Sequence, residues 1–264
     1  MLSHPATQRN LKALSTMGYQ IIPPSIGEQA CGEYGPGRLP DPQQILTEIF
    51  SDESAKLHDF NVTVTAGPTR EALDPVRYIS NNSSGKQGMA IAEASLSVGA
   101  NVTLIAGPGV ARSKDAIKRI DVCSAEEMLD QVMREMPKTD LFISVAAVAD
   151  YKAKTISANK IKKRDLAKSS PRIELEETPD IIRLVASMKE RPLVIGFAAE
   201  TNSAVQNAKI KLKDKNLDAI IVNDVSRDDI GFDSNENEVT FISAKKERAI
   251  AKTDKDSLLS LIHI

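Results

Sequence analysis

From about residue 60 onward, short apolar runs alternate with amphipathic or alanine-rich stretches. The apolar runs lack the polar–apolar alternation of a half-exposed strand, which is typical of strands that helices cover on both faces. The predicted strands span 61–65, 101–106, 119–122, 141–145, 193–197 and 218–222. The predicted helices span 89–98, 124–135, 179–189 and 204–215. This order predicts an α/β fold with a doubly wound, mainly parallel sheet.

Two of these helices have marked starts, and the end of the chain departs from the α/β order. Residues 124–127 form a capping box, and Thr178 precedes Pro179, which places a capping side chain before a proline at the first helical position. Residues 231–243 predict a β-hairpin with a polar turn before its apolar alternation, and residues 254–264 predict a closing helix. The expected architecture is therefore a Rossmann-like sheet with a C-terminal β-hairpin.

The first fifty residues follow a different pattern from the rest. Their predicted elements are a helix over 5–18, a strand over 19–24, a glycine- and proline-rich loop over 27–42 and a helix over 42–51. Long loops are predicted over 66–87 and 146–172, and loops of that length in an α/β domain are usually functional or disordered. We expect a small N-terminal appendage (1–50), a linker (51–59) and a main domain (60–264).

Composition and charge narrow the class of protein. The chain is 41% hydrophobic and 27% charged, with a formal net charge of -2, so nothing overall favours binding to nucleic acid or a membrane surface. No apolar run approaches the ~18 residues of a membrane span, and the first residues lack the pattern of a signal peptide. Two cysteines, Cys31 and Cys123, do not suggest a disulfide framework. We expect a cytoplasmic protein without nucleic-acid or membrane partners.

Polar segments follow four of the predicted strands, where ligands of open α/β sheets bind. These segments are 66–88, 146–163, 196–202 and 222–232. They and the last predicted α/β helix carry a group of cations, namely Lys86, Lys160, Lys162, Lys163, Lys211 and Lys215. Cations and the backbone N–H groups of residues 83–88 suit a triphosphate, because phosphoryl and nucleotidyl transfer depend on charge stabilisation. Asp150 is placed to hold a metal ion or the edge of a base.

Each of these features has a second interpretation. KIKK and the pair Lys211 and Lys215 are compatible with solvated surface faces, the glycine-containing loop with a simple turn, and Asp150 with a cap. His4, His58 and His263 lack the spacing of metal ligands. Composition and spacing alone therefore predict an α/β domain and leave nucleotide binding open.

Taken together, four segments resemble a known family: TAGPTREALDPVRYISNNSSGKQG, AAVADYKAKTISANKIKK, GFAAETN and KNLDAIIVNDV. They resemble the phosphopantothenate–cysteine ligase domain of the bifunctional coenzyme A biosynthesis protein, over about residues 61–243. The resemblance implies that 4'-phosphopantothenate attacks CTP, giving an acyl-cytidylate and pyrophosphate, and that cysteine then displaces CMP to give phosphopantothenoylcysteine. It also implies Mg²⁺ with the CTP, and a homodimer with residues of both subunits near the substrate.

The resemblance assigns roles to single residues. Asn81 matches the asparagine that processes the acyl-cytidylate, and Lys160 matches the lysine of the first half-reaction. The substrate-binding loop comprises Ser83, Ser84, Gly85 and Lys86. The residues that match nucleotide-binding positions are Ala146, Ala147, Asp150, Lys160, Thr178, Pro179, Asp180, Ile181, Phe197, Lys211 and Lys215. No metal ligand is identified. The sequence departs from the common family pattern at Gln87, Asn159 and Thr178, where methionine, glutamate and asparagine are usual.

The N-terminal segments HPATQRNLKAL and ACGEYGPGRLPDPQQI resemble the C-terminal end of the decarboxylase half of the same bifunctional family. Cys31 matches its catalytic cysteine, which lies on a flap. The FMN-binding core would precede Met1, so neither FMN binding nor decarboxylation is expected of this chain alone. Cys31 is then expected to be an orphaned cysteine on a loop.

Two other functions fit the same architecture: a non-catalytic nucleotide- or NAD(P)-binding module, and an inactive remnant. The combination of Asn81 with Lys160 favours the ligase over the module, because a dinucleotide-binding protein has no need of that pair.

Overall fold

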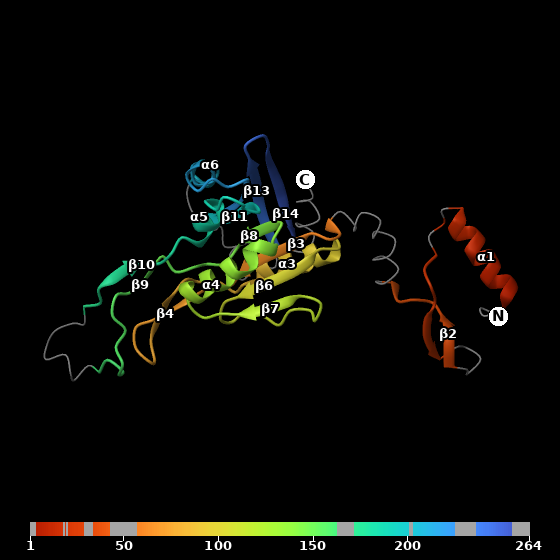
Figure 1. Cartoon of the computed structure of the whole chain (residues 1–264), viewed down its shortest axis with the longest axis horizontal. Coiled ribbons are helices and arrows are strands. Elements are labelled where there is room, and N and C mark those ends of the chain that lie inside the picture. Colours follow the sequence, from red (N-terminus) through yellow and green to blue (C-terminus); the bar gives the residue numbers. More distant parts are fainter. Residues whose placement is uncertain are drawn as a thin grey trace. The chain divides into compact units, whose positions relative to one another are not determined.

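The structure is a computed structural model of the 264-residue chain (Figure 1). It describes residues 4–17, 19, 21–28, 34–42, 57–162, 172–200, 203–224 and 236–254. The chain divides into two compact units, Met1–Lys56 and Leu57–Ile264, which are described separately. Their boundary falls within the stretch 51–59 that the sequence marks as a linker.

The first unit begins with the predicted helix. Helix α1 spans Pro5–Thr16, and the side chain of His4 caps it by accepting a hydrogen bond from Ala6 N at 3.2 Å. Proline follows the cap directly, where its missing N–H costs nothing. No residue of this helix is buried. The helix predicted over 5–18 is confirmed.

The strand predicted over 19–24 is wrong, because the described residues of that range are irregular. The strands described in this unit are β1 (Ser25–Glu28), which runs into the predicted loop over 27–42, and β2 (Tyr34–Arg38), which lies within it; the two pair antiparallel. Glycine and proline are depleted in strands, so their presence hid this hairpin. Cys31 and residues 43–51 of the second predicted helix lie outside the described residues.

The second unit is built on an eight-stranded sheet with the order β14-β13-β12-β11-β8-β3-β6-β7, in which β13 spans Glu236–Ser243 and β14 spans Glu247–Asp254. The parallel strands are β3 (Asn61–Ala66), β6 (Asn101–Ala106), β7 (Lys118–Asp121), β8 (Leu141–Ser144), β11 (Leu193–Glu200) and β12 (Ala219–Asp224). Numbered along the chain, these strands have the doubly wound order 3-2-1-4-5-6. The predicted α/β Rossmann-like fold is therefore confirmed.

Helices connect the parallel strands and cover the sheet (Figure 1). They are α3 (Lys86–Ser97), α4 (Ala125–Glu135), the short 3₁₀ helix η2 (Met136–Lys138), α5 (Ile181–Ala186) and α6 (Ala204–Asp214). Phe142 packs in one aliphatic cluster with α4, α5 and α6, whereas Ile143 packs in another with α3. Because adjacent strand residues point to opposite faces, the core lies on both sides of the sheet.

Several element ends differ from the prediction. Helix α3 begins at Lys86, ahead of the predicted start at residue 89, and α5 is shorter than the predicted 179–189. The capping box before α4 is confirmed, since Ser124 Oγ accepts from Glu127 N at 3.2 Å. The Glu127 carboxylate accepts a hydrogen bond from Cys123 N at 2.6 Å, one residue before the cap.

Both long predicted loops contribute strands to small two-stranded sheets, the second of which pairs a strand in the loop with one just after it. Strands β4 (Arg70–Ala72) and β5 (Tyr78–Ser80) pair antiparallel, as do β9 (Tyr151–Ala153) and β10 (Leu175–Glu177). The prediction of loops over 66–87 and 146–172 missed them, because three-residue strands are too short to show a period.

The C-terminal hairpin is confirmed in kind but displaced. It pairs β13 (Glu236–Ser243) with β14 (Glu247–Asp254), so its turn follows the apolar alternation and does not precede it. Asp254 ends a strand and does not begin the predicted closing helix, whose remaining residues lie outside the described part. No helix among the described residues is long and apolar enough to cross a membrane.

Candidate functional site

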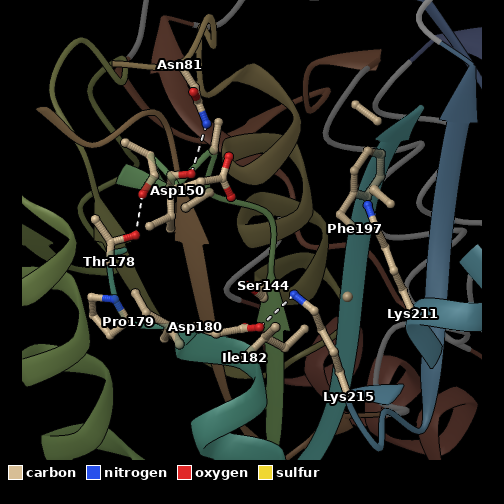
Figure 2. Close-up of a pocket in the computed structure, with 18 of the residues that line it drawn as sticks. Asn81, Ser144, Asp150, Thr178, Pro179, Asp180, Ile182, Phe197, Lys211 and Lys215 are labelled. Carbon is tan, nitrogen blue, oxygen red and sulfur yellow. Dashed lines mark hydrogen bonds and ion pairs between the residues drawn. The ribbon is translucent and has the colours of Figure 1, made fainter. Parts of the chain in front are cut away.

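A cleft of about 630 Å³ opens beyond the carboxyl ends of β8 and β11 (Figure 2). Strand β8 is the first strand past the point where the strand order reverses, next to β3. Crevices at such a switch point are where doubly wound sheets bind ligands. The cleft therefore lies where a ligand site is expected in a doubly wound fold.

Most of the residues singled out in the sequence meet in this cleft. Those that line it are Asn81, Ala146, Ala147, Asp150, Thr178, Pro179, Asp180, Ile181, Phe197, Lys211 and Lys215. Lining residues without a predicted role are Ser144, Val148, Ala149, Tyr151, Glu177, Ile182, Gly196, Ala198, Ala199, Leu217 and Ile220. Many of the residues without a predicted role are adjacent in sequence to predicted ones. Taking each motif as a whole would have found them.

Two buried threonines of the β3 strand and its exit hold the loop after β8 in place. Thr65 Oγ1 accepts hydrogen bonds from Val145 N at 3.2 Å and Ala146 N at 3.3 Å, and Thr69 Oγ1 accepts from Ala149 N at 3.0 Å. Both threonines are almost fully buried, with 1% and 0% exposure. The cleft loop is thus bonded to the neighbouring strand exit, and sequence reasoning assigned these threonines no role.

Asn81 reaches the cleft from the hairpin of β4 and β5. Its Nδ2 donates to Val148 O at 2.9 Å, as Figure 2 shows. The preceding residue, Ser80, donates its hydroxyl to Thr69 O at 2.7 Å. These two hydrogen bonds connect the end of the hairpin with both strand exits at the switch point. The side-chain amide of Asn81 therefore has a defined position at the cleft wall.

Thr178 and Asp180 close another wall of the cleft, with roles that differ from the prediction. Thr178 donates its hydroxyl to Ala149 O, and its N–H donates to Asp150 O at 3.0 Å. Asp180 is the N-cap of α5, with Oδ1 accepting from Arg183 N at 3.2 Å. The prediction that Thr178 caps this helix is wrong, because its hydroxyl is engaged by the loop after β8.

The two predicted lysines of α6 face the cleft and each has a carboxylate partner. Lys211 Nζ lies 2.6 Å from Glu200 Oε1, and Lys215 Nζ lies 3.0 Å from Asp180 Oδ2. Asn207 Nδ2 donates to the second oxygen of Glu200 at 3.1 Å, which fixes that carboxylate. Figure 2 shows both lysines on the α6 side of the cleft, with Asn81 on the other. Two oriented ammonium groups in a concave site favour a phosphorylated ligand.

The other predicted lysine and the predicted substrate loop do not line the cleft. Lys160 is exposed on the segment after β9. The loop of Ser83–Gly85 leads into α3, whose N-cap, Gly85, packs against the exit of β3, where a Cβ would lie 3.3 Å from Gly67 Cα. Of the SNNSSGKQG loop, Asn81 alone contributes to the lining of the cleft as the described residues define it.

The acidic residues that line the cleft, Asp150, Glu177 and Asp180, do not form a metal cluster. Within the described ranges, no group of three or more histidine, cysteine, aspartate or glutamate residues is arranged to hold a metal ion. Mg²⁺ that accompanies a nucleotide takes most of its ligands from phosphate and water, with one or two carboxylates from the protein. The residues present fit that mode of binding.

A family model described as the DNA/pantothenate metabolism flavoprotein C-terminal domain matches residues 57–263. The coenzyme A biosynthesis bifunctional protein CoaBC of Vibrio vulnificus (strain YJ016) is 46% identical over 261 residues, which are 98% of this chain and 65% of that protein. CoaBC of Escherichia coli (strain K12) is 44% identical over 260 residues, 97% of this chain and 64% of that protein. The chain thus spans just under two thirds of the length of these relatives.

Solved structures share the fold. The crystal structure of the C-terminal domain of CoaBC has a TM-score of 0.67 and 35% identity, and the match covers 79% of this chain and 94% of that one. A Cab2 mutant in complex with phosphopantothenate-cysteine has a TM-score of 0.63, with 83% of this chain and 91% of that chain covered. At 16% identity, the second likeness concerns the fold alone.

Proposed function

Because the chain belongs to the family of the DNA/pantothenate metabolism flavoprotein C-terminal domain, we propose that it is a CTP-dependent phosphopantothenate–cysteine ligase of coenzyme A biosynthesis. The carboxylate of 4'-phosphopantothenate attacks the α-phosphorus of CTP and expels pyrophosphate. The amine of cysteine then attacks the acyl carbon, and CMP leaves. The observation that carries the proposal is the switch-point cleft, which gathers Asn81 and every predicted nucleotide-binding residue except Lys160.

The cleft offers groups suited to each part of the nucleotide. Lys211 and Lys215 supply positive charge for the phosphates, because ammonium groups in a partly enclosed site stabilise charge better than in water. Phe197, which is partly buried against the core, supplies an apolar surface for the base or ribose. Asp150 supplies an acceptor for an amino or hydroxyl group. Small side chains at Ala146 and Ala147 let the nucleotide approach the backbone.

Asn81 is assigned to the second half-reaction. One N–H of its side-chain amide donates to Val148 O, which holds the group in place. An amide nitrogen carries two N–H donors, so the other is available for the acyl oxygen. Negative charge develops on that oxygen when the cysteine amine attacks. A pre-positioned donor at this point lowers the barrier.

Lys160 enters the proposal through a homodimer. It does not line the cleft, and Figure 1 shows the chain after β9 running away from the main sheet. The homodimer that the resemblance implies gives this segment a second copy to act on. In that arrangement the lysine neutralises the α-phosphate during attack by the carboxylate. Mg²⁺ bound together with CTP would supply positive charge to the phosphate oxygens.

The proposed function of this chain includes neither FMN binding nor decarboxylation. Cys31, which matches the catalytic cysteine of the decarboxylase half, lies outside the described residues. The ligase proposal concerns the second unit and its cleft.

The test is pyrophosphate release by the purified chain with CTP, Mg²⁺, 4'-phosphopantothenate and cysteine, omitting each in turn. We expect release that requires CTP and 4'-phosphopantothenate, with CMP formed only when cysteine is also present. Sedimentation of the same sample gives its oligomeric state. Folded protein that binds CTP without releasing pyrophosphate would contradict the ligase and favour a nucleotide-binding module.

A further inference from the structure

Asp74 stands out as a buried carboxylate outside the cleft, between β4 and β5. Its side chain is 0% exposed. Oδ1 accepts from Val76 N at 2.7 Å and Arg77 N at 2.9 Å, which closes the local turn. Oδ2 accepts from Arg77 Nη1 at 2.6 Å and Ile161 N at 3.2 Å. Burial raises the pKa of Asp74, but these hydrogen bonds outweigh it and bring the pKa down to about 2. The carboxylate is therefore charged at any working pH.

The contact with Ile161 joins segments that are 87 residues apart in the sequence. The peptide groups of Ile161 are held on both sides, because Arg77 Nη1 also donates to Ile161 O at 2.9 Å. Nearer to β9, Ser157 N donates to Leu73 O at 3.0 Å. The segment after β9 is thus docked on the β4–β5 hairpin by three hydrogen bonds from the chain on either side of Asp74.

The docked residue lies between two exposed lysines. Ile161 is half-buried, whereas Lys160 and Lys162 are exposed, and within the described part of the chain neither lysine forms an ion pair. The ammonium group of a lysine sits on four rotatable bonds, so its reach is defined only if its backbone is fixed. Asp74 and Arg77 hold that backbone through hydrogen bonds to the N–H and C=O groups of Ile161.

We propose that Asp74 is a positioning residue for residues 160–162. It holds the Ile161 peptide so that Lys160 is presented in the geometry required by the first half-reaction. This inference rests on the proposed ligase function. A displacement of about 1 Å in a catalytic group can cost ~100-fold in rate. A turn alone requires only the Oδ1 contacts. The second oxygen is directed at the distant segment, and that contact carries the inference.

The variant Asp74→Asn separates the two tasks of the carboxylate. Asparagine keeps an oxygen for Val76 N and Arg77 N, but its amide nitrogen can accept neither from Ile161 N nor from Arg77 Nη1. We expect the Ile161 amide to exchange with deuterium at least tenfold faster in the variant, with unchanged exchange in β3 and β8. The matched control is Asp121→Asn, which removes an exposed carboxylate paired with Arg119 and is expected to leave Ile161 unchanged.

Kinetics test the consequence for the reaction. We expect Asp74→Asn to lower the kcat of pyrophosphate release from CTP and 4'-phosphopantothenate by about tenfold, with the Kd for CTP within twofold of wild type. In a Lys160→Gln background the same change is expected to have no further effect, because the two residues act as a unit. Independent, multiplying losses, or an equal loss of CTP affinity, would overturn the positioning role.

A second variant approaches the contact from the other side. Ile161→Pro removes the N–H that donates to Asp74 and changes no residue of the β4–β5 hairpin. It is therefore expected to reproduce the loss of kcat. Full activity of this variant would overturn the inference even if Asp74→Asn fails to fold. A wild-type chain that releases no pyrophosphate would overturn the ligase assignment and the kinetic part together. An Ile161 amide that exchanges at the wild-type rate in Asp74→Asn would overturn the positioning role alone.

Discussion

Lys215 Nζ lies 3.0 Å from Asp180 Oδ2, so the residue that ends α6 is paired with the residue that caps α5 across one side of the cleft. Both residues line the cleft. In the absence of ligand, the carboxylate keeps the ammonium group pointing along the cleft wall. A phosphate that enters competes with the carboxylate for the same ammonium. The ion pair thus holds the ammonium group of Lys215 where a nucleotide phosphate would bind.

Replacing Lys215 tests whether this cation binds nucleotide. We expect Lys215→Gln to raise the Kd for CTP by about tenfold, which corresponds to about 1.4 kcal/mol, because the phosphates lose a charged partner. Calorimetric titration of CTP with Mg²⁺ measures the change. Lys213→Gln is the matched control, since Lys213 is on the same helix but does not line the cleft. Equal losses in the two variants would point to overall charge and contradict a specific role for Lys215.

Replacing Asn81 tests the proposed division between half-reactions. Asn81→Asp places a carboxylate oxygen against Val148 O, where Nδ2 now donates, and puts negative charge where the acyl oxygen would need a donor. We expect acyl-cytidylate to form and accumulate, with phosphopantothenoylcysteine formation slowed by about 100-fold or more. Rapid quenching followed by chromatography of the nucleotide products distinguishes the two steps.

The neighbouring asparagine provides the control for that experiment. Asn82→Asp adds the same charge to the same loop, but Asn82 does not line the cleft, so both half-reactions are expected to proceed nearly as in wild type. Normal turnover by Asn81→Asp would remove Asn81 from the mechanism.

The doubly wound sheet and the meeting of its polar segments at one edge could be predicted from sequence patterns, whereas the single residues of the cleft were assigned by the family resemblance. Parallel strands read as uninterrupted apolar runs, and the polar segments that follow them must share one edge of the sheet. The segment after β3, which contains Asn81, and the segment after β8, which contains Asp150, therefore meet at the cleft. Residues of α5 and α6 line the same cleft.

The features that could not be predicted depend on contacts between distant residues. Asp74 and Ile161 meet across 87 positions with no periodicity to signal it. Thr65 is a residue type common in strands, so nothing marked its hydroxyl as the acceptor for two amides of the cleft loop. Thr178 and Asp180 are both good caps by composition. Asp180 is the cap because the Thr178 hydroxyl instead donates to Ala149 O in the loop after β8.

The close approach of α3 to β3 gives a prediction about stability. At Gly88, in the first turn of α3, a Cβ would lie 2.5 Å from Ala66 Cβ and 3.0 Å from Ala66 Cα. We expect Gly88→Ala to lower the free energy of unfolding of the second unit by about 1–3 kcal/mol, because the helix must move away from the strand. Urea denaturation measures it. Gly109→Ala is the comparison, since its φ of +86° is strained but no atom lies within 4 Å of a Cβ there. A larger loss at Gly109 would show that backbone strain matters more than the helix–strand contact.

Arg191 and Asp218 join the starts of β11 and β12 through two hydrogen bonds from the guanidinium to the carboxylate. Asp218 Oδ2 also accepts from Val194 N at 2.8 Å. Partial burial raises the pKa of Asp218, but the hydrogen bonds from Arg191 and Val194 outweigh it and leave the pKa below its ordinary value of 3.8. The folded state therefore binds this proton less readily than the unfolded state.

A lowered pKa sets the direction of the pH dependence. The stabilisation by Asp218 is fully present above the unfolded pKa of 3.8 and is lost as the pH falls through the lower folded value. We expect Asp218→Asn to cost about 1–3 kcal/mol at pH 7, because Arg191 and Val194 N lose a charged acceptor, and the difference from wild type to shrink below about pH 4. Urea denaturation at pH 7, 5 and 3 measures it. Asp121→Asn, which breaks an exposed pair with Arg119, is expected to change stability by less than about 1 kcal/mol. A cost of Asp218→Asn that stays constant down to pH 3 would mean that the carboxylate acts by shape and not by charge.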